Sequence, residues 1–211
     1  GPMDDVNGDG TADLLVGSSY TYYYYAYGRS YLFYGGSSIA GAVGASNYDV
    51  RVSADSSSAF DSPRMSAVAD VDGDGLADVV VGAYYDSSSR EDNCGSVSFF
   101  SGAALGTGAV ELSAADDRVY GVEERDYLGY SLVAADVDGD GYADAIAGAP
   151  YYDEGESSGG AIFILSGNNS LSWDSYIDDA ASVEIRGDQR NLNLGEDTLA
   201  HPGDVDGDGD I

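Results

Sequence analysis

The sequence predicts an all-β protein whose repeats have four antiparallel strands each, with about three repeats in the chain. Three observations carry this prediction. A nine-residue acidic motif recurs at nearly constant spacing, short apolar runs of strand-forming residues follow each copy, and no segment shows a sustained helical period. The chain has 211 residues, of which 43% are hydrophobic, so it can bury the core of one globular domain.

The acidic motif reads Asp-Val-Asn-Gly-Asp-Gly-Thr-Ala-Asp in its first copy, residues 5–13. Copies begin at residues 5, 70, 136 and, truncated, 204, so successive starts are 65, 66 and 68 residues apart. Such a period is typical of a supersecondary unit repeated along a chain. We therefore divide the sequence into a remnant of a cleaved tag, three repeats and the start of a truncated fourth: residues 1–3, 4–69, 70–135, 136–203 and 204–211.

Each repeat continues with runs of four to six residues, rich in β-branched and aromatic types and bounded by Gly and Ser, which favours strands. The first expected strands are 14–17, 79–82 and 145–148, and the second are 31–34, 97–100 and 161–164. Weaker third strands are 49–52, 118–121 and 183–185, and a fourth precedes the next motif at 65–69 and 131–135.

Four strands per period of this length is the strand count of a β-propeller blade. Propellers close with four to eight blades, so three blades form a partial propeller or one that is completed by a homo-oligomer. Two chains could supply six blades, but the terminal motifs at Asp5 and Asp204 would then compete for one place. We therefore favour a segment of a longer array.

The motif has the composition of a metal-binding loop. Oxygen-bearing side chains stand at positions 1, 3, 5 and 9, and Gly at positions 4 and 6 permits the positive φ that a wrapped loop requires. Position 7 varies in side chain, as expected if only its carbonyl oxygen binds the ion. The candidate ligands are Asp5, Asn7, Asp9, Thr11, Asp13; Asp70, Asp72, Asp74, Leu76, Asp78; Asp136, Asp138, Asp140, Tyr142, Asp144; and Asp204, Asp206, Asp208.

Hard oxygen ligands without His or Cys select Ca²⁺ or, less well, Mg²⁺. An EF-hand would need a bidentate Glu at position 12, but Val16, Val81 and Ala147 stand there, so position 9 closes the shell instead. The alternative is that Asp-Gly runs are solvated turns. Three complete copies in register favour three calcium sites, with a partial fourth.

The charge supports bound cations. Acidic residues number 38 against 8 basic ones, for a formal net charge of -30. This charge repels nucleic acid and anionic membrane surfaces, and it strains a compact fold unless cations neutralise part of it. A generally acidic surface, as in proteins adapted to high salt, is an alternative that is compatible with metal binding.

The remaining composition excludes several classes of protein. Cys94 is the one cysteine, so the chain forms no internal disulfide and carries no Cys-x-x-Cys zinc or redox pair. No apolar run approaches the ~20 residues that span a bilayer. Calcium loops of modest affinity fill outside the cytosol, so we expect an extracellular or cell-surface protein whose signal peptide lies outside this sequence.

At this point the sequence resembles the FG-GAP repeats of integrin α-subunit β-propellers and their bacterial relatives. The best match is Leu128-Gly129, residues 131–135, the loop 136–144 and Gly148-Ala149-Pro150. The resemblance implies that calcium clamps the first two strands of each blade on one face. It also implies that ligands are engaged by loops on the opposite face, which here are residues 18–29, 84–95 and 151–159.

The first of these loops is rich in tyrosine, namely Tyr20, Tyr22, Tyr23, Tyr24, Tyr25 and Tyr27. Tyr interleaved with small polar residues suits recognition, because it orders a large amphipathic area at low entropic cost. Alternatively, a Tyr-rich hairpin packs its rings on neighbouring blades. Arg186-Gly187-Asp188 spells the tripeptide that integrins recognise, but a propeller stands on the receptor side of that interaction.

Three function hypotheses follow. The leading one is a calcium-stabilised propeller module for extracellular protein or carbohydrate recognition and adhesion. The second is a structural repeat or spacer of a larger surface protein, in which calcium only rigidifies the blades. An enzyme is disfavoured, because the chain has one His, one Cys and no Lys, and its paired carboxylates are already explained as metal ligands.

Overall fold

The structure is a computed structural model, which describes residues 4–22, 25–36, 39, 43–54, 63, 65–88, 91–153, 158–173, 176–196 and 199–200. These residues form twelve strands, the short helix α1 (Ile177–Ala180) and two 3-10 turns, Ala45–Asn47 and Leu112–Ala114. The strands form three sheets of four, so the prediction of a nearly all-β fold is confirmed. Among the described residues, no helix has the length and apolar character needed to cross a membrane.

The second and third sheets have the predicted strand composition. The second has the order β4 (Met65–Ala69), β5 (Asp78–Ala83), β6 (Ser96–Phe100) and β8 (Asp117–Tyr120). The third has the order β9 (Ser131–Ala135), β10 (Asp144–Ala149), β11 (Ala161–Leu165) and β12 (Val183–Arg186). All neighbours in these two sheets are antiparallel, and in each sheet the strand before the acidic loop pairs with the strand after it.

The first sheet is assembled differently. It contains β1 (Leu14–Tyr22), β2 (Tyr25–Phe33) and β3 (Val50–Ser53), followed by β7 (Gly108–Glu111) at its outer edge. β7 comes from the segment that joins β6 to β8 of the second sheet, and it pairs parallel to β3 with Val52 opposite Val110. The chain therefore links the first and second sheets through main-chain hydrogen bonds as well as through side-chain packing.

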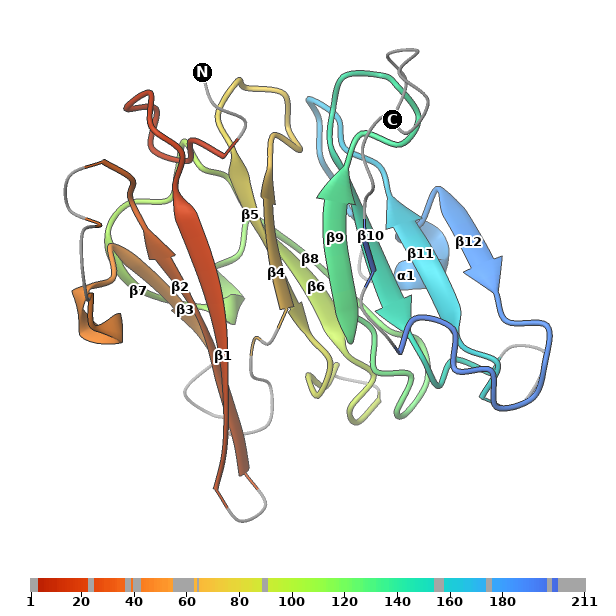
Figure 1. The fold of residues 1–211 in the computed structure, drawn as a ribbon. Coiled ribbons are helices and arrows are strands. Elements are labelled where there is room, and N and C mark those ends of the chain that lie inside the picture. The colour runs from red at the N-terminus through yellow and green to blue at the C-terminus, as the bar shows by residue number, and fades with distance from the viewer. Residues whose placement is uncertain are drawn as a thin grey trace.

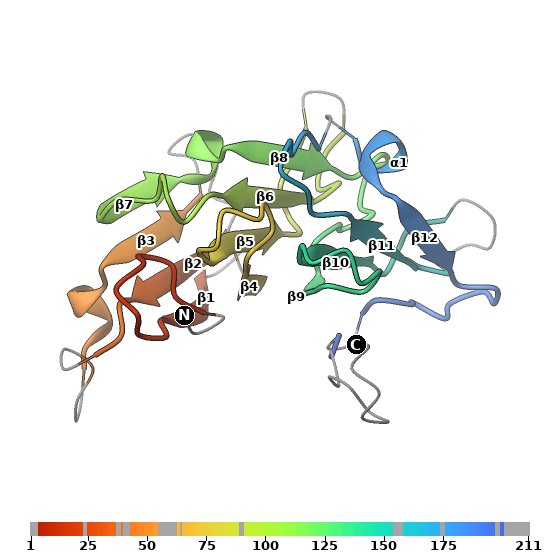
Figure 2. The ribbon, with the colours of Figure 1, turned by 90° about the horizontal axis from the view of Figure 1, so that it is seen from above.

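The three sheets stand side by side like neighbouring blades, with β1, β4 and β9 as the first strand of each (Figure 1). The view from above shows the sheets fanned around the side on which β4 and β9 lie (Figure 2). The three described acidic loops lie together at one end of the strands, at the top of Figure 1. This arrangement of four-stranded sheets is that of propeller blades.

Alternate side chains along the strands of the central blade point to opposite faces of the sheet, and they fill two separate cores. All residues of β5 and β6 are buried, because a sheet covers each of their faces. Val79 and Val81 of β5 pack with Leu32 and Val50 of the first blade, whereas Val80 packs toward the third blade. Burying both faces of a strand produces the continuous Val-Val-Val run in the sequence.

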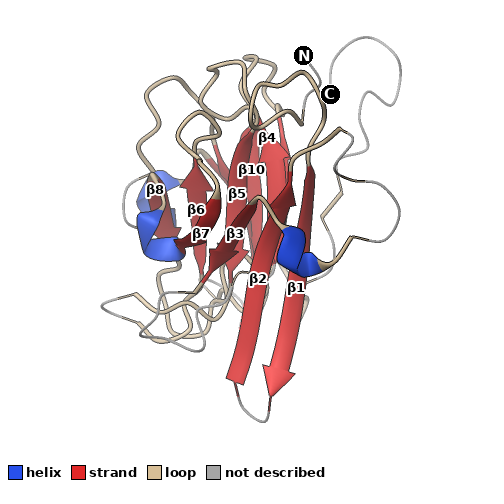
Figure 3. Cartoon of the chain, turned by 90° about the vertical axis from the view of Figure 1, so that its left-hand side faces the viewer, coloured by secondary structure: helices blue, strands red, loops and turns tan. Residues whose placement is uncertain are grey.

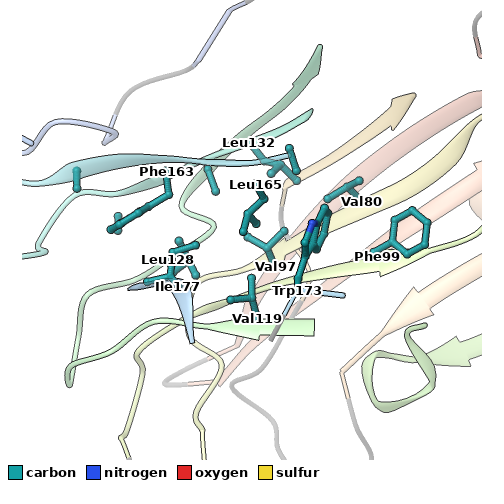
Figure 4. Close-up of a cluster of buried hydrophobic side chains, with 14 of the residues drawn as sticks. Val80, Val97, Phe99, Val119, Leu128, Leu132, Phe163, Leu165, Trp173 and Ile177 are labelled. Atoms are coloured by element: carbon teal, nitrogen blue, oxygen red, sulfur yellow. The ribbon is translucent and has the colours of Figure 1, made fainter. Parts of the chain in front are cut away.

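The core between the second and third blades is built around aromatic rings (Figure 4). Trp173 meets Phe99 edge-on with ring centroids 5.8 Å apart, and its Nε1 donates a hydrogen bond to the Ser166 carbonyl at 3.2 Å. Its backbone N–H donates to the carboxylate of Asp117 on β8. The segment after β11 therefore fastens the third blade to the second.

Two sequence expectations need correction. Residues 18–29 are not a loop, because β1 and β2 continue as a ladder to the pair Tyr22 and Tyr25, and only residues 23 and 24 separate the strands. This hairpin extends below the other connections (Figure 3). The short strand β7 was not predicted, because Gly-Ala-Val-Glu carries one β-branched residue and half of it is exposed.

Candidate metal sites

The first Asp of each acidic loop organises the loop backbone. Asp70 accepts hydrogen bonds from the Gly73 and Gly75 N–H groups, at 2.7 and 3.1 Å, one on each carboxylate oxygen. These two glycines have φ of +74° and +89°, a region in which a residue with a side chain is strained. Asp5 and Asp136 hold the glycines at positions 4 and 6 of their own loops in the same way.

The Asp at position 9 ties the loop to the rest of its blade. One oxygen of Asp78 accepts the Val71 N–H at 2.8 Å, and the other accepts the Gly102 N–H at 2.9 Å. Burial raises the pKa of Asp78 to about 6, against these hydrogen bonds, which favour the charged form. Asp13 and Asp144 make the equivalent pairs of bonds, with Val6 and Gly35 and with Val137 and Gly167.

Three carboxylates converge in each of two loops. Asp70, Asp72 and Asp78 each offer an oxygen within 4.8 Å of the others, and Asp136, Asp138 and Asp144 do the same. Calcium–oxygen distances of about 2.3–2.6 Å allow ligand oxygens on opposite sides of one ion to lie roughly 5 Å apart. The spacing of the oxygens therefore fits a single divalent ion in each loop.

The first loop carries the same arrangement with one fewer charge. Asn7 stands at position 3, so an amide oxygen replaces a carboxylate beside Asp5 and Asp13. The Asn7 side-chain oxygen accepts the Asp9 N–H at 2.9 Å, as the Asp72 and Asp138 carboxylates accept the N–H of position 5 in their loops. An amide oxygen is also a ligand of hard cations, so this loop offers an all-oxygen set as well.

The Asp at position 5 is exposed and lies outside the two converging groups. In each loop, its carboxylate accepts the N–H of position 7 at 2.8 to 2.9 Å, from Thr11, Leu76 or Tyr142. Burial raises the pKa of Asp72, and the charge of Asp74 contributes to that shift. The loops therefore crowd negative charges that a divalent cation would neutralise.

Three glycines that the sequence analysis did not select complete the arrangement. Gly35, Gly102 and Gly167 donate their N–H to the position-9 Asp, and each stands two residues after the second strand that follows its loop, namely β2, β6 or β11. A Cβ on any of them would lie within 2.1 to 2.3 Å of the carbonyl oxygen at position 8. Their recurrence at the same place in every repeat was the available signal.

Some predicted residues lie outside the described part of the chain. Asp204, Asp206 and Asp208 of the truncated fourth loop do so, as do Tyr23 and Tyr24. Tyr20 and Tyr22 lie on β1, and Tyr25 and Tyr27 lie on β2, so these four belong to the projecting hairpin. Because β1 begins directly after the first acidic loop and runs away from it, the last described pair of the ladder, Tyr22 and Tyr25, lies at the opposite end of the blade.

Four-stranded blades with an acidic oxygen-donor loop at one end define the class of protein: a repeat protein of the β-propeller type. Residues 66–100 and 128–165 match the family model for the FG-GAP repeat. These two segments therefore match FG-GAP repeats, as the sequence motifs predict. The chain is also similar to integrin alpha pat-2 of Caenorhabditis briggsae, with 35% identity over 115 residues. That match covers 48% of this chain and 9% of the relative's length.

The glycines of these repeats have a packing role in the structure. A Cβ on Gly82, near the end of β5, would lie 2.5 Å from the carbonyl oxygen of Gly129, which precedes β9 of the third blade. Gly148 approaches Gly195 in the same way, also at 2.5 Å. In each pair the two backbones pass in direct contact, which leaves no room for a Cβ on either residue.

Proposed function

We propose that this chain is a calcium-binding β-propeller module of an extracellular or cell-surface protein. The convergence of three carboxylates in each of two loops carries the calcium half of this proposal. Carboxylates held this close repel one another, and one member of each group is buried, so a bound cation would remove an electrostatic cost of folding. Extracellular calcium is abundant enough to fill such loops, which supports the location.

Calcium fits this donor set better than magnesium does. The side chains at positions 1, 3, 5 and 9 and the carbonyl at position 7 would hold the ion, for example Asp70, Asp72, Asp74, Asp78 and Leu76 in the second loop. Calcium accepts six to eight oxygen ligands in flexible geometry, whereas magnesium demands a near-ideal octahedron and keeps several waters. Calcium bound there would neutralise and rigidify the loop.

The recognition half of the proposal assigns the module to adhesion, with a protein or glycan as partner. Its support is the similarity to an integrin alpha subunit and the Tyr-rich hairpin at the end of the blade opposite the acidic loops. A binding role also fits the composition, which supplies one His, one Cys and no Lys for catalysis. A calcium-rigidified spacer without a ligand of its own is the second candidate.

Calcium titration followed by thermal unfolding tests the first half. Free calcium at 100 times Kd should stabilise the fold by about 2.7 kcal/mol for each site. Each kcal/mol raises Tm by roughly 2–4 °C in a protein of this size. Sodium chloride at matched ionic strength is the control for general screening of the acidic surface. If chelator and saturating calcium give the same Tm, the calcium proposal is wrong.

Replacing the six tyrosines at positions 20, 22, 23, 24, 25 and 27 by Ser tests the recognition half of the proposal. Binding to a glycan array and to extracellular-matrix proteins would be compared between the parent chain and the variant, both saturated with calcium. The proposal expects binding by the parent and its loss in a variant with unchanged Tm. Equal binding by both proteins would exclude the hairpin as the recognition site, and binding by neither would favour the spacer.

A further inference from the structure

Adjacent acidic loops are joined by direct backbone hydrogen bonds. The Ala77 N–H of the second loop donates to the carbonyl oxygen of Asp5 in the first loop, at 2.9 Å. The Ala143 N–H of the third loop donates in the same way to the carbonyl oxygen of Asp70, at 2.8 Å. In both cases the N–H at position 8 of the later loop donates to the carbonyl oxygen at position 1 of the earlier loop.

The side chain at position 7 adds a second contact in the same direction. Tyr142 of the third loop lies against Gly73 of the second, with a ring carbon 2.1 Å from the place that a Cβ on Gly73 would take. Leu76 of the second loop approaches Gly8 of the first, with Cδ2 3.1 Å from the corresponding place. Position 4 is the glycine whose N–H the first Asp binds, so each later loop supports the turn of the earlier one.

The loop that would follow the third one, residues 204–211, lies outside the described residues. Gly139 is the position-4 glycine of the third loop, and among the described residues no heavy atom lies within 4 Å of where its Cβ would be. Its φ of +77° nevertheless matches the +74° of Gly8 and Gly73. The turn therefore has the same φ whether or not a contact from a following loop is described.

We propose that neighbouring metal loops are energetically coupled through these contacts, so that calcium in one loop raises the affinity of the loop before it. This inference rests on the proposed calcium binding. Ala77 stands between Leu76 and Asp78, and Ala143 stands between Tyr142 and Asp144, so each coupling N–H lies between two ligands of its own loop. An ion that orders positions 7 to 9 would therefore also order the position-8 N–H, which donates to the first Asp of the preceding loop.

Leu76 and Tyr142 are positioning residues in this scheme. Their carbonyl oxygens would bind the ion of their own loop, whereas their side chains contact the position-4 glycine of the preceding loop. By thermodynamic linkage, the preceding loop must strengthen binding in the later loop by the same factor. Couplings between sites are typically 5- to 150-fold in affinity, so the effect is measurable.

The test reads each loop separately by NMR during a calcium titration. The amides of Gly73 and Gly139 bond to the first Asp of the second and third loops, so their resonances report those loops one at a time. We expect Tyr142→Ala to move the Gly73 midpoint to at least fivefold higher calcium, although every ligand of the second loop is unchanged. Tyr142→Leu, which copies position 7 of the second loop, should restore the midpoint.

Tyr151→Ala is the matched control, because Tyr151 is an exposed tyrosine that follows the far end of β10 from the third loop. It should leave the Gly73 midpoint unchanged. An unaltered Gly73 midpoint in Tyr142→Ala, with only a lower Tm in chelator, would show a merely structural role and overturn the coupling. If neither amide of the parent chain responds to calcium, the proposed calcium binding fails and the coupling fails with it.

Discussion

At the scale of single residues, the acidic loops depend on glycines of two kinds. Those inside the motif, such as Gly73 and Gly75, adopt positive φ, and the sequence pattern predicts them. Gly102 lies outside the motif and has another task, because it brings its N–H to Asp78 while its Cα passes the Ala77 carbonyl. Only the second kind needs tertiary structure to be recognised.

Gly102→Ala should therefore destabilise the protein. The new Cβ would lie 2.1 Å from the Ala77 carbonyl oxygen, so the strand end must move and the hydrogen bond to Asp78 weakens. We expect a loss of about 1–3 kcal/mol in the free energy of unfolding, measured by urea denaturation in calcium.

Gly106→Ala is the control for this substitution. Gly106 lies in the same connection, but apart from its chain neighbours no heavy atom of the described residues lies within 4 Å of the place its Cβ would take. Its unfolding free energy should change by less than about 0.5 kcal/mol. Equal effects of the two substitutions would contradict a role for the close approach at Gly102.

At the scale of elements, the strands that follow the acidic loops were the most predictable. β5 and β10 begin at the position-9 Asp and carry apolar runs that end at Gly82 and Gly148, the glycines that contact Gly129 and Gly195. The Tyr-rich segment was misread as a loop, because its Ser, Thr and Gly residues are typical of turns. Nine residues of β1 instead pair in register with nine of β2, so cross-strand pairing overrides the local turn composition.

β7, in contrast, could not be predicted from the local sequence. Its four residues have little strand propensity of their own, and they form a strand because β3 presents an edge with free backbone groups. The Gly108 N–H donates to the Asp49 carbonyl at 2.7 Å, which starts the parallel pairing. A strand that exists through its partner in another blade leaves no local pattern.

At the scale of the whole molecule, equivalent residues differ in burial according to whether the structure describes a blade after them. Val6 and Val71, at position 2 of the first and second loops, are 0% exposed. Val137, at the same position of the third loop, is 38% exposed. Each loop is therefore covered by the blade that follows it among the described residues.

Val71→Ala should accordingly cost more stability than Val137→Ala. Val71 belongs to the core between the second and third blades, so its truncation leaves a cavity there. We expect a loss of about 1–2 kcal/mol for Val71→Ala and less than about 0.5 kcal/mol for Val137→Ala, measured by urea denaturation. Equal losses would indicate that Val137 is also covered in solution, for example by a second copy of the chain.

The sequence by itself determined the repeat, the strand type and the candidate ligands of each acidic loop. These features depend on local chemistry: the side-chain period, the glycines at positive φ and the spacing of oxygen donors. Only the tertiary structure decided that the carboxylates at positions 1, 3 and 9 lie close together in the second and third loops, that Gly102 donates to Asp78, and that one loop donates a hydrogen bond to the one before it. Such contacts join residues of different strands and blades, so packing between blades fixes them and no local pattern encodes them.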